Sequence, residues 1–233
     1  MKIPNIVVSD ATRYRTAPRV DTSAGYFSLY EDVLRRMPHE DIEHVASELV
    51  RAYRLRRTVY LFGNGGSAAL ASHFACDLAK GTRMQASDCE NFRAMSLTDN
   101  VAVMTAWAND TSYEEIFAQQ IQTFVSPGDI AFAISASGNS PNVLLALEMA
   151  KASRAFTIGL GGFDGGRMKM LCDASVIIPS DNMQVVEDFQ LSVAHALFNI
   201  VRHRMAKPTA KAVSASIETN GVRTYVETGM TRG

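Results

Sequence analysis

Val-Tyr-Leu-Phe-Gly-Asn-Gly-Gly-Ser, residues 59–67, is the stretch of sequence that decides the fold. A short apolar run that ends in glycines is typical of a buried parallel strand leading into a phosphate-type loop. Such a loop presents backbone N–H groups and the start of a helix to an anion. Asn64 and Ser67 would add side-chain donors, and Gly65 and Gly66 permit a tight turn. A glycine turn between strand and helix is equally often only a turn, so this loop leaves both interpretations open.

The same pattern recurs downstream and predicts the architecture. Further apolar runs lie at 130–134, 156–160 and 176–178. Helical segments lie between them, and they are expected at about 67–80, 100–124 in two pieces, 141–153, 165–171 and 184–205. Strands that alternate with helices indicate βαβ units and a parallel sheet covered on both faces. We therefore expect an α/β fold, a three-layer α-β-α sandwich with a flavodoxin-like sheet.

The segments outside this core define the domain limits. Apolar residues at helical spacing predict helices at 23–37 and at 39–55, separated by Pro38. Residues 1–22 are polar and irregular, so we expect an N-terminal arm. Residues 207–233 are rich in small polar residues and are expected to form a flexible tail, with a short strand possible at 222–226. Residues 23–206 would then form a single domain.

Composition excludes several classes of function. The chain has 233 residues with 23 basic and 24 acidic side chains, and this balance gives no argument for nucleic acid or an anionic membrane as partner. Its three cysteines form no CxxC pair, so neither a disulfide framework nor a zinc ribbon is indicated. No signal peptide and no membrane-spanning run is evident, and we expect a cytoplasmic protein.

A second loop strengthens the phosphate interpretation. Ser135-Ala136-Ser137-Gly138-Asn139-Ser140 also follows an apolar run and precedes a helix. Three hydroxyls at a helix start can bind phosphate oxygens together with backbone amides, whereas a simple helix cap would explain only Ser140. Ligands of doubly wound sheets bind beyond the carboxyl ends of the strands, where both loops would lie. No Walker or GxGxxG motif is present, which favours a phosphate ester over a nucleotide.

Four side chains on two helices suggest a metal site. His73 and Asp77 are four residues apart and share a helix face. Glu187 and His195, eight residues apart, lie about 80° apart on the last helix. Two imidazoles and two carboxylates suit Zn²⁺ or another first-row ion. Spacing alone also allows a surface pair and a core histidine, so both interpretations remain open.

The longer motifs identify a family. The quoted segments are GNGGSAA-x-A-x-HFA, AxANDxxYEEIFAQQ, GDIAFAISASGNSPNVLLALEMAK and GLGGFDGG. Together they resemble the SIS (sugar isomerase) domain, most of all its phosphoheptose isomerase branch, over residues 25 to 205. The resemblance implies a sugar-phosphate substrate bound by two loop segments. The implied contact positions are Asn64, Gly65, Gly66, Asn109, Asp110, Ser135, Ala136, Ser137 and Ser140.

The resemblance also implies an aldose–ketose isomerase that acts on sedoheptulose 7-phosphate with a bound divalent metal, most simply zinc. The family's metal set of His, Glu, Gln and His corresponds to His73, Asp77, Glu187 and His195. Asp77 and His195 would be the catalytic base and acid, and Glu187 would also contact substrate. The family's Gly-Arg is replaced within residues 79–83. We expect the shorter Asp77 and the longer acidic Glu187 to compensate for each other.

Two hypotheses about function remain. Members of this family are usually tetramers whose first and last helices bundle together, with sites at subunit interfaces, and the amphipathic 23–55 region suits such a homotetramer. The alternative to an enzyme is a non-catalytic SIS protein that binds a phosphosugar or a protein partner. A binding module has no need for two histidines and two carboxylates in one pocket, which favours the enzyme. Cys76, on the same helix as His73, is interpreted as a small core residue.

Overall fold

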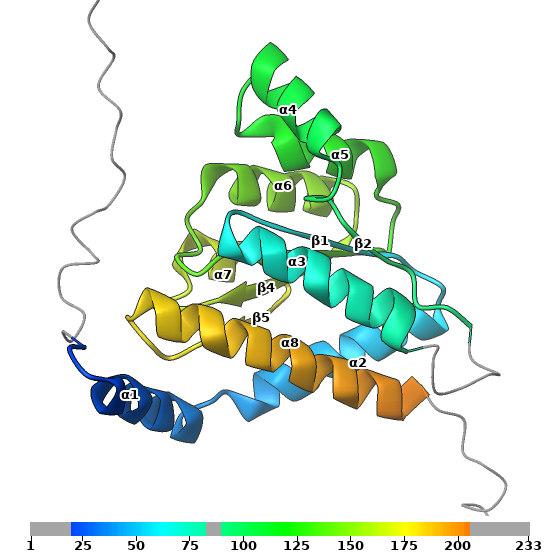
Figure 1. The fold of residues 1–233 in the computed structure, drawn as a ribbon. Coiled ribbons are helices and arrows are strands. Elements are labelled where there is room, and N and C mark those ends of the chain that lie inside the picture. Colours follow the sequence, from blue (N-terminus) through cyan, green and yellow to red (C-terminus); the bar gives the residue numbers. More distant parts are fainter. Residues whose placement is uncertain (1–19, 83–89, 206–233) are drawn as a thin grey trace, which may run out of the picture.

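The computed structural model describes residues 20–82 and 90–205 (Figure 1). Within these residues the chain forms one parallel sheet with helices on both faces. This confirms the expected α/β sandwich. The expected tail and its short strand at 222–226 lie outside the described residues, as does nearly all of the N-terminal arm.

The sheet has five parallel strands in the order β2-β1-β3-β4-β5. This is the flavodoxin-like order that the sequence predicts. The strands are β1 (Val59–Gly63), β2 (Ala94–Ser96), β3 (Ile130–Ile134), β4 (Phe156–Gly161) and β5 (Ala174–Ile177). The sequence pattern missed β2 because this edge strand has only three residues and two of them are not buried, so it contains no continuous apolar run.

Successive residues of each strand point to opposite faces of the sheet and so build two cores. Leu61 and Phe132 face the layer formed by α2 (His39–Arg54), α3 (Gly66–Cys76) and α8 (Met183–Met205). Phe62 and Ala133 face the layer of α5 (Glu115–Phe124), α6 (Pro141–Ala152) and α7 (Gly166–Leu171). Figure 1 shows α3 and α8 next to each other on one side and α6 on the other.

The remaining helices lie at the edges of these layers. The helix α1 (Ser23–Arg35) begins at Thr22, whose hydroxyl accepts a hydrogen bond from the Gly25 backbone. The helix α4 (Val101–Asp110) begins at Asn100 in the same way. No helix among residues 20–82 and 90–205 is long and apolar enough to cross a membrane.

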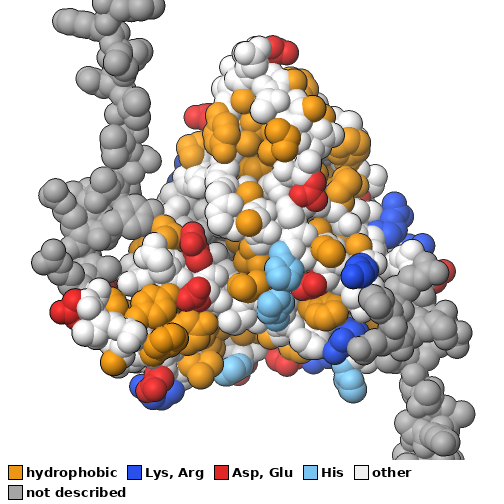
Figure 2. Space-filling model, in the orientation of Figure 1, with side chains coloured by type: hydrophobic (Ala, Val, Ile, Leu, Met, Phe, Trp, Pro, Cys, Tyr) orange, Lys and Arg blue, Asp and Glu red, His pale blue; other side chains and the backbone are white. Residues whose placement is uncertain are grey.

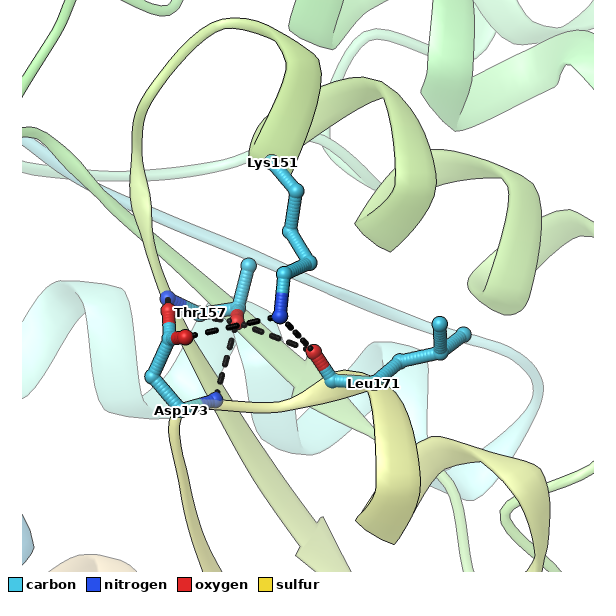
Figure 3. Close-up of polar contacts among 4 residues, drawn as sticks. All are labelled: Lys151, Thr157, Leu171 and Asp173. Atoms are coloured by element: carbon cyan, nitrogen blue, oxygen red, sulfur yellow. Dashed lines mark hydrogen bonds and ion pairs between the residues drawn. The ribbon is translucent and has the colours of Figure 1, made fainter.

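A polar network stabilises the amino end of the sheet (Figure 3). The Asp173 carboxylate accepts hydrogen bonds from the backbone and the hydroxyl of Thr157, at 2.8 and 2.9 Å. Lys151 lies beside them, with its Nζ 2.8 Å from the Leu171 carbonyl oxygen and 3.4 Å from Asp173. Partial burial raises the pKa of Asp173, but the bonds from Thr157 and the charge of Lys151 outweigh it, so the pKa lies below its usual value. These hydrogen bonds occupy the polar groups at the amino end of the sheet, and the loops at the carboxyl end are the ones available to bind a ligand.

Candidate functional site

The two predicted loops lie next to each other at the carboxyl end of the sheet. Gly63 is the last residue of β1 and pairs in register with Ile134, the last residue of β3. Each strand continues directly into a loop and then a helix, α3 after the first and α6 after the second. Both helix N-termini therefore start at this edge, where parallel α/β sheets bind ligands.

The first loop is a tight turn that only glycine allows at two positions. A Cβ on Gly63 would lie 2.5 Å from the Ile134 carbonyl oxygen, so the loop packs directly on the end of β3. Gly65 has a φ of 55°, in the left-handed region, and no atom lies within 4 Å of where its Cβ would be. The space beside Gly65 is consequently open at the start of α3. Ser67 is buried in the first turn of that helix.

The second loop is nested against the loop that follows β4. A Cβ on Gly138 would lie 2.0 Å from the Gly165 carbonyl oxygen, so no larger residue fits there. Ser135 is buried, and its hydroxyl accepts a hydrogen bond from the Gly138 backbone at 3.2 Å. Its Oγ also lies 3.5 Å from the Oγ of Ser140. Ala136 is buried, and the Ser137 hydroxyl accepts a hydrogen bond from the Asn139 backbone, so hydrogen bonds within the turn hold the second loop.

Two residues that sequence reasoning did not select hold the first loop through Asn64. Asn142, in the first turn of α6, exchanges two hydrogen bonds with Asn64, at 2.9 and 2.8 Å between their side-chain amides. Tyr113, between α4 and α5, donates its hydroxyl proton to the same Asn64 oxygen at 3.0 Å. Both lie inside motifs that carry the family resemblance, but their partners are 78 and 49 residues away in the chain, which no local pattern reveals.

A cavity of about 420 Å³ opens beside Asn64. Its wall combines apolar side chains of α5, such as Phe117, with the hydroxyls of Ser72 and Thr98. The two hydroxyls lie 3.0 Å apart, and Ser72 also donates to the Asp99 carboxylate. None of the serines of the second loop lines this cavity, and neither does any residue of the predicted metal set. The cavity therefore extends the first loop toward α4 and α5.

Three of the four predicted metal ligands meet on the face of the molecule where α3 lies beside α8. The Nε2 atoms of His73 and His195 lie 3.3 Å apart. The Asp77 carboxylate lies 3.5 Å from His73 and 3.9 Å from His195, measured to the same ring nitrogens. Figure 2 shows two histidine side chains side by side on this face with an acidic side chain next to them. We call His73, Asp77 and His195 the His-Asp-His group.

The spacing of the His-Asp-His group suits a tetrahedral ion. Nitrogen or oxygen ligands at about 2.0–2.1 Å from a tetrahedral Zn²⁺ lie about 3.3–3.4 Å apart. The three observed separations of 3.3, 3.5 and 3.9 Å lie at or just above this value. If both rings carry their proton on Nδ1, each Nε2 atom has a lone pair to offer to an ion, together with a carboxylate oxygen. These three residues therefore fit a divalent metal, and the choice of metal is left open by their geometry.

Glu187, the fourth predicted ligand, lies elsewhere. A Cβ on Gly66 would meet its carboxylate oxygen at 3.2 Å, so Glu187 lies beside the first turn of α3. The helices α3 and α8 run side by side. Gly66 lies next to Glu187 near the start of both helices, and His73 lies next to His195 further along them. His195 lies about 12 Å further along α8 than Glu187. The structure thus does not bring Glu187 into the His-Asp-His group, and its carboxylate lies beside the first turn of α3.

Three further positions that the sequence singled out are exposed. Asn109 and Asp110 are exposed at the end of α4, and the amide of Asn109 donates to the carboxylate of Asp110. Cys76 is exposed, so its interpretation as a core residue was wrong. The residue after it, Asp77, begins a π-helical turn, η2 (Asp77–Gly81), that ends α3. Such turns occur frequently at functional sites.

Comparison with known sequences places these features in context. A sequence profile of the SIS domain matches residues 25–162. A phosphoheptose isomerase of Trichlorobacter lovleyi is 37% identical over 160 residues, which cover 69% of this chain and 80% of that protein. Another, from Paramagnetospirillum magneticum, is 42% identical over 139 residues, or 60% and 71% of the two chains.

Solved structures of similar proteins agree. The phosphoheptose isomerase of Neisseria gonorrhoeae aligns with a TM-score of 0.71 and 25% identity, covering 77% of this chain and 96% of that chain. The phosphoheptose isomerase of Francisella tularensis aligns with the same TM-score and coverage at 27% identity. Both the sequence and the arrangement of helices and strands are therefore similar to those of phosphoheptose isomerases.

Proposed function

The chain belongs to the SIS domain family, with relatives that are phosphoheptose isomerases, and on this premise we propose that it interconverts sedoheptulose 7-phosphate and the corresponding aldose, a D-glycero-heptose 7-phosphate. The enzyme class, a sugar-phosphate isomerase, follows from that similarity. The particular sugar and the roles of the residues are the proposal. We also infer that the enzyme works in the cytoplasm.

The observation that carries the proposal is the placement of two sites along α3. The glycine loop lies at the N-terminus of this helix, where backbone donors favour a phosphate group. His73 lies two helical turns further on, about 10 Å along the helix axis from Gly66. A long sugar phosphate can place its phosphate at the loop and its carbonyl carbon near the His-Asp-His group. A short triose phosphate could not reach both, which favours a longer sugar chain such as that of a heptulose phosphate.

The residues of the chain divide the work accordingly. The backbone of Gly65 and Gly66, with Asn64 and Ser67, would bind the phosphate from the first loop. Ser135, Ala136, Ser137 and Ser140 would bind it from the second. These contacts are remote from the reacting carbons and serve to position them. Glu187, beside Gly66, would accept hydrogen bonds from sugar hydroxyls, and Asn109 and Asp110 would contact the substrate from α4.

Asp77 and His195 would transfer the protons. From ketose to aldose, the Asp77 carboxylate accepts a proton from C1, next to the C2 carbonyl, to form an enediol. A proton is then returned to C2 with His195 as the acid, while one hydroxyl proton moves from O1 to O2, and transfer of the proton from Asp77 to His195 restores both side chains. One proton leaves carbon and one returns to carbon, so the reaction is balanced. The 3.9 Å between the two side chains lets them act on neighbouring atoms of the substrate.

His73, Asp77 and His195 would hold the metal, most simply zinc, whereas Glu187, which the sequence added to this set, would contact the sugar from beside Gly66. A divalent ion held there would supply positive charge next to the negative charge that develops on the sugar oxygens. Asp77 is one methylene shorter than glutamate. The expected compensation by Glu187 would need its carboxylate in the group, whereas the π-helical turn that begins at Asp77 is a local change of backbone that would accommodate the shorter side chain.

The test is to incubate metal-loaded protein with sedoheptulose 7-phosphate and to follow the appearance of aldose by NMR. The wild type is expected to form aldose, and His195→Ala is expected to lose turnover while it still binds the sugar phosphate. His203→Ala, a substitution of an exposed histidine further along α8, is the matched control and should leave turnover unchanged. Normal turnover by His195→Ala would exclude His195 as the acid. Binding without conversion by the wild type would favour the non-catalytic alternative.

We also propose that the enzyme is a homotetramer with sites at subunit interfaces. The helix α1 exposes Phe27 and Leu34, at 62% and 59%, and α8 exposes Leu191. Tyr30 of α1 packs on Phe189 of α8, with ring centroids 4.2 Å apart, so the two helices form one apolar surface. Burial of such a surface against another copy is favourable. Light scattering during gel filtration would test the state, and a monomer at micromolar concentration would exclude a stable tetramer.

A further inference from the structure

Asn142 is a buried polar residue that has no part in the proposed phosphate and metal sites. It is 2% exposed, at the start of α6. We propose that Asn142 is a positioning residue: its side chain holds Asn64 and thereby keeps the two loops at the separation that binds a phosphate group. The identity of the ligand rests on the proposed function, whereas the contact between the loops does not.

The hydrogen bonds of Asn142 define the orientation of both amides. The backbone N–H of Val143 donates to its Oδ1 at 3.0 Å, so that atom must be an oxygen and not the amide nitrogen. The remaining amide group of Asn142 is then a donor, and it faces Asn64 Oδ1 at 2.8 Å. Asn64 in turn presents its own NH₂ to Asn142 Oδ1 at 2.9 Å. A flip of either amide would bring two donors or two acceptors together.

This orientation limits what Asn64 can do. Its Oδ1 accepts from Asn142 and from the Tyr113 hydroxyl, which uses both of its lone pairs. Its backbone carbonyl oxygen accepts a hydrogen bond from the Ser67 backbone at 3.0 Å, so Asn64 has one side-chain N–H left for a ligand. Tyr113 is 60% exposed and must be the donor in its bond to Asn64, so its oxygen can still accept a hydrogen bond from a sugar hydroxyl. Asn64 then acts on the ligand mainly through the loop geometry that Asn142 imposes.

Packing alone does not explain an amide at position 142. A buried amide is costly unless its hydrogen bonds are made, and the neighbouring Val143 and Leu144 are apolar and buried. Both hydrogen bonds between Asn142 and Asn64 connect α6 to the first loop. Together they bridge the ends of β1 and β3, at the point where Gly63 packs on Ile134. The bonded pair therefore sets the relative position of the two loops.

Two substitutions separate positioning from stability. Asn142→Asp keeps the acceptor for Val143 and adds a negative charge that a helix N-terminus favours, but it turns the donor to Asn64 into a second acceptor. Asn142→Ser is neutral and keeps an oxygen at the helix start, but it is too short to reach Asn64. Asn182→Asp is the matched control, because Asn182 accepts a backbone hydrogen bond from Val185 at the start of α8 without contacting either loop.

The measurements are KM and kcat for sedoheptulose 7-phosphate and, independently of turnover, the affinity for inorganic phosphate from NMR titration. We expect both position-142 variants to stay folded, to raise KM and weaken phosphate binding about tenfold, and to keep kcat within about threefold. The control should match the wild type in all of these. Wild-type KM and phosphate affinity in either variant would overturn the proposal, as would a change confined to the aspartate variant, since that would reflect charge repulsion alone.

Results that refute the proposed function differ from results that refute the role of Asn142. A wild-type protein that binds phosphate without converting the heptulose phosphate would refute the isomerase substrate. The phosphate affinities of the variants would then decide the role of Asn142 by themselves. A wild type that binds neither compound would overturn both proposals.

Discussion

Metal-dependent thermal stability gives a sharp test of the His-Asp-His group. A ligand present at 100 times its Kd stabilises the folded state by about 2.7 kcal/mol. For a domain of this size, about 1 kcal/mol shifts Tm by about 2–4 °C, so zinc should raise Tm by about 5–11 °C over the EDTA-treated protein. Asp77 lies 3.5 and 3.9 Å from the two ring nitrogens, so Asp77→Ala removes one of three ligands.

Loss of a residue that only supports a metal ligand typically weakens metal binding 10–100-fold, so loss of the Asp77 ligand itself should weaken zinc binding by at least as much. At a 100-fold weaker Kd and the same zinc concentration, about 0.4 kcal/mol remains, or a Tm shift of about 1–2 °C. Differential scanning fluorimetry with and without zinc measures both shifts. Glu187→Gln is the informative comparison: it should keep the full shift, because Glu187 lies beside Gly66 and not in the group. A full shift in Asp77→Ala, or a shift lost equally in Glu187→Gln, would refute the geometry.

Three further predictions concern the frame that holds the site. Asp173→Asn should lower the free energy of unfolding by about 1–2 kcal/mol at pH 7. Because the folded pKa of Asp173 lies below its usual value, that contribution is present above the usual carboxyl pKa of about 4 and disappears as the pH falls through the folded pKa. Urea melts in a pH series should therefore show the difference from wild type shrinking in acid, and a constant difference would contradict this. Burial, followed by the charge of Asp173, raises the pKa of the Cys172 thiol to about 12, whereas Cys76 is exposed. In a Cys89→Ser background at pH 8, iodoacetamide should label Cys76 and spare Cys172 until denaturant is added, as mass spectrometry can check. Gly138→Ala should lower the free energy of unfolding by well over the roughly 1–2 kcal/mol expected for Gly65→Ala. Both glycines have a positive φ, but only a Cβ on Gly138 would meet a backbone atom, at 2.0 Å. Similar melting curves for the two variants would refute this.

Much of the fold was predictable because its signals are local. Apolar runs that end in glycine or serine loops specify buried strands and the helices that follow them, whatever lies elsewhere in the chain. Four of the five strands and the course of the helices were found in this way. The exception, β2, is a short edge strand that depends on pairing with β1 and carries no pattern of its own. The two loops were predictable for the same reason, since each strand leads directly into its loop.

The reacting end of the site depended on tertiary structure. The sequence places Glu187 and His195 on the same broad side of one helix, and that spacing allows both to join His73 and Asp77. The helix α8 runs alongside α3, so residues at similar distances along the two helices lie next to each other. Glu187 therefore lies next to Gly66, and His195 lies next to His73. Asn142 likewise finds Asn64 only because β1 and β3 are neighbours in the sheet. The sequence by itself determined which side chains are available, and helix and strand packing decided which of them meet, because those contacts join residues far apart along the chain.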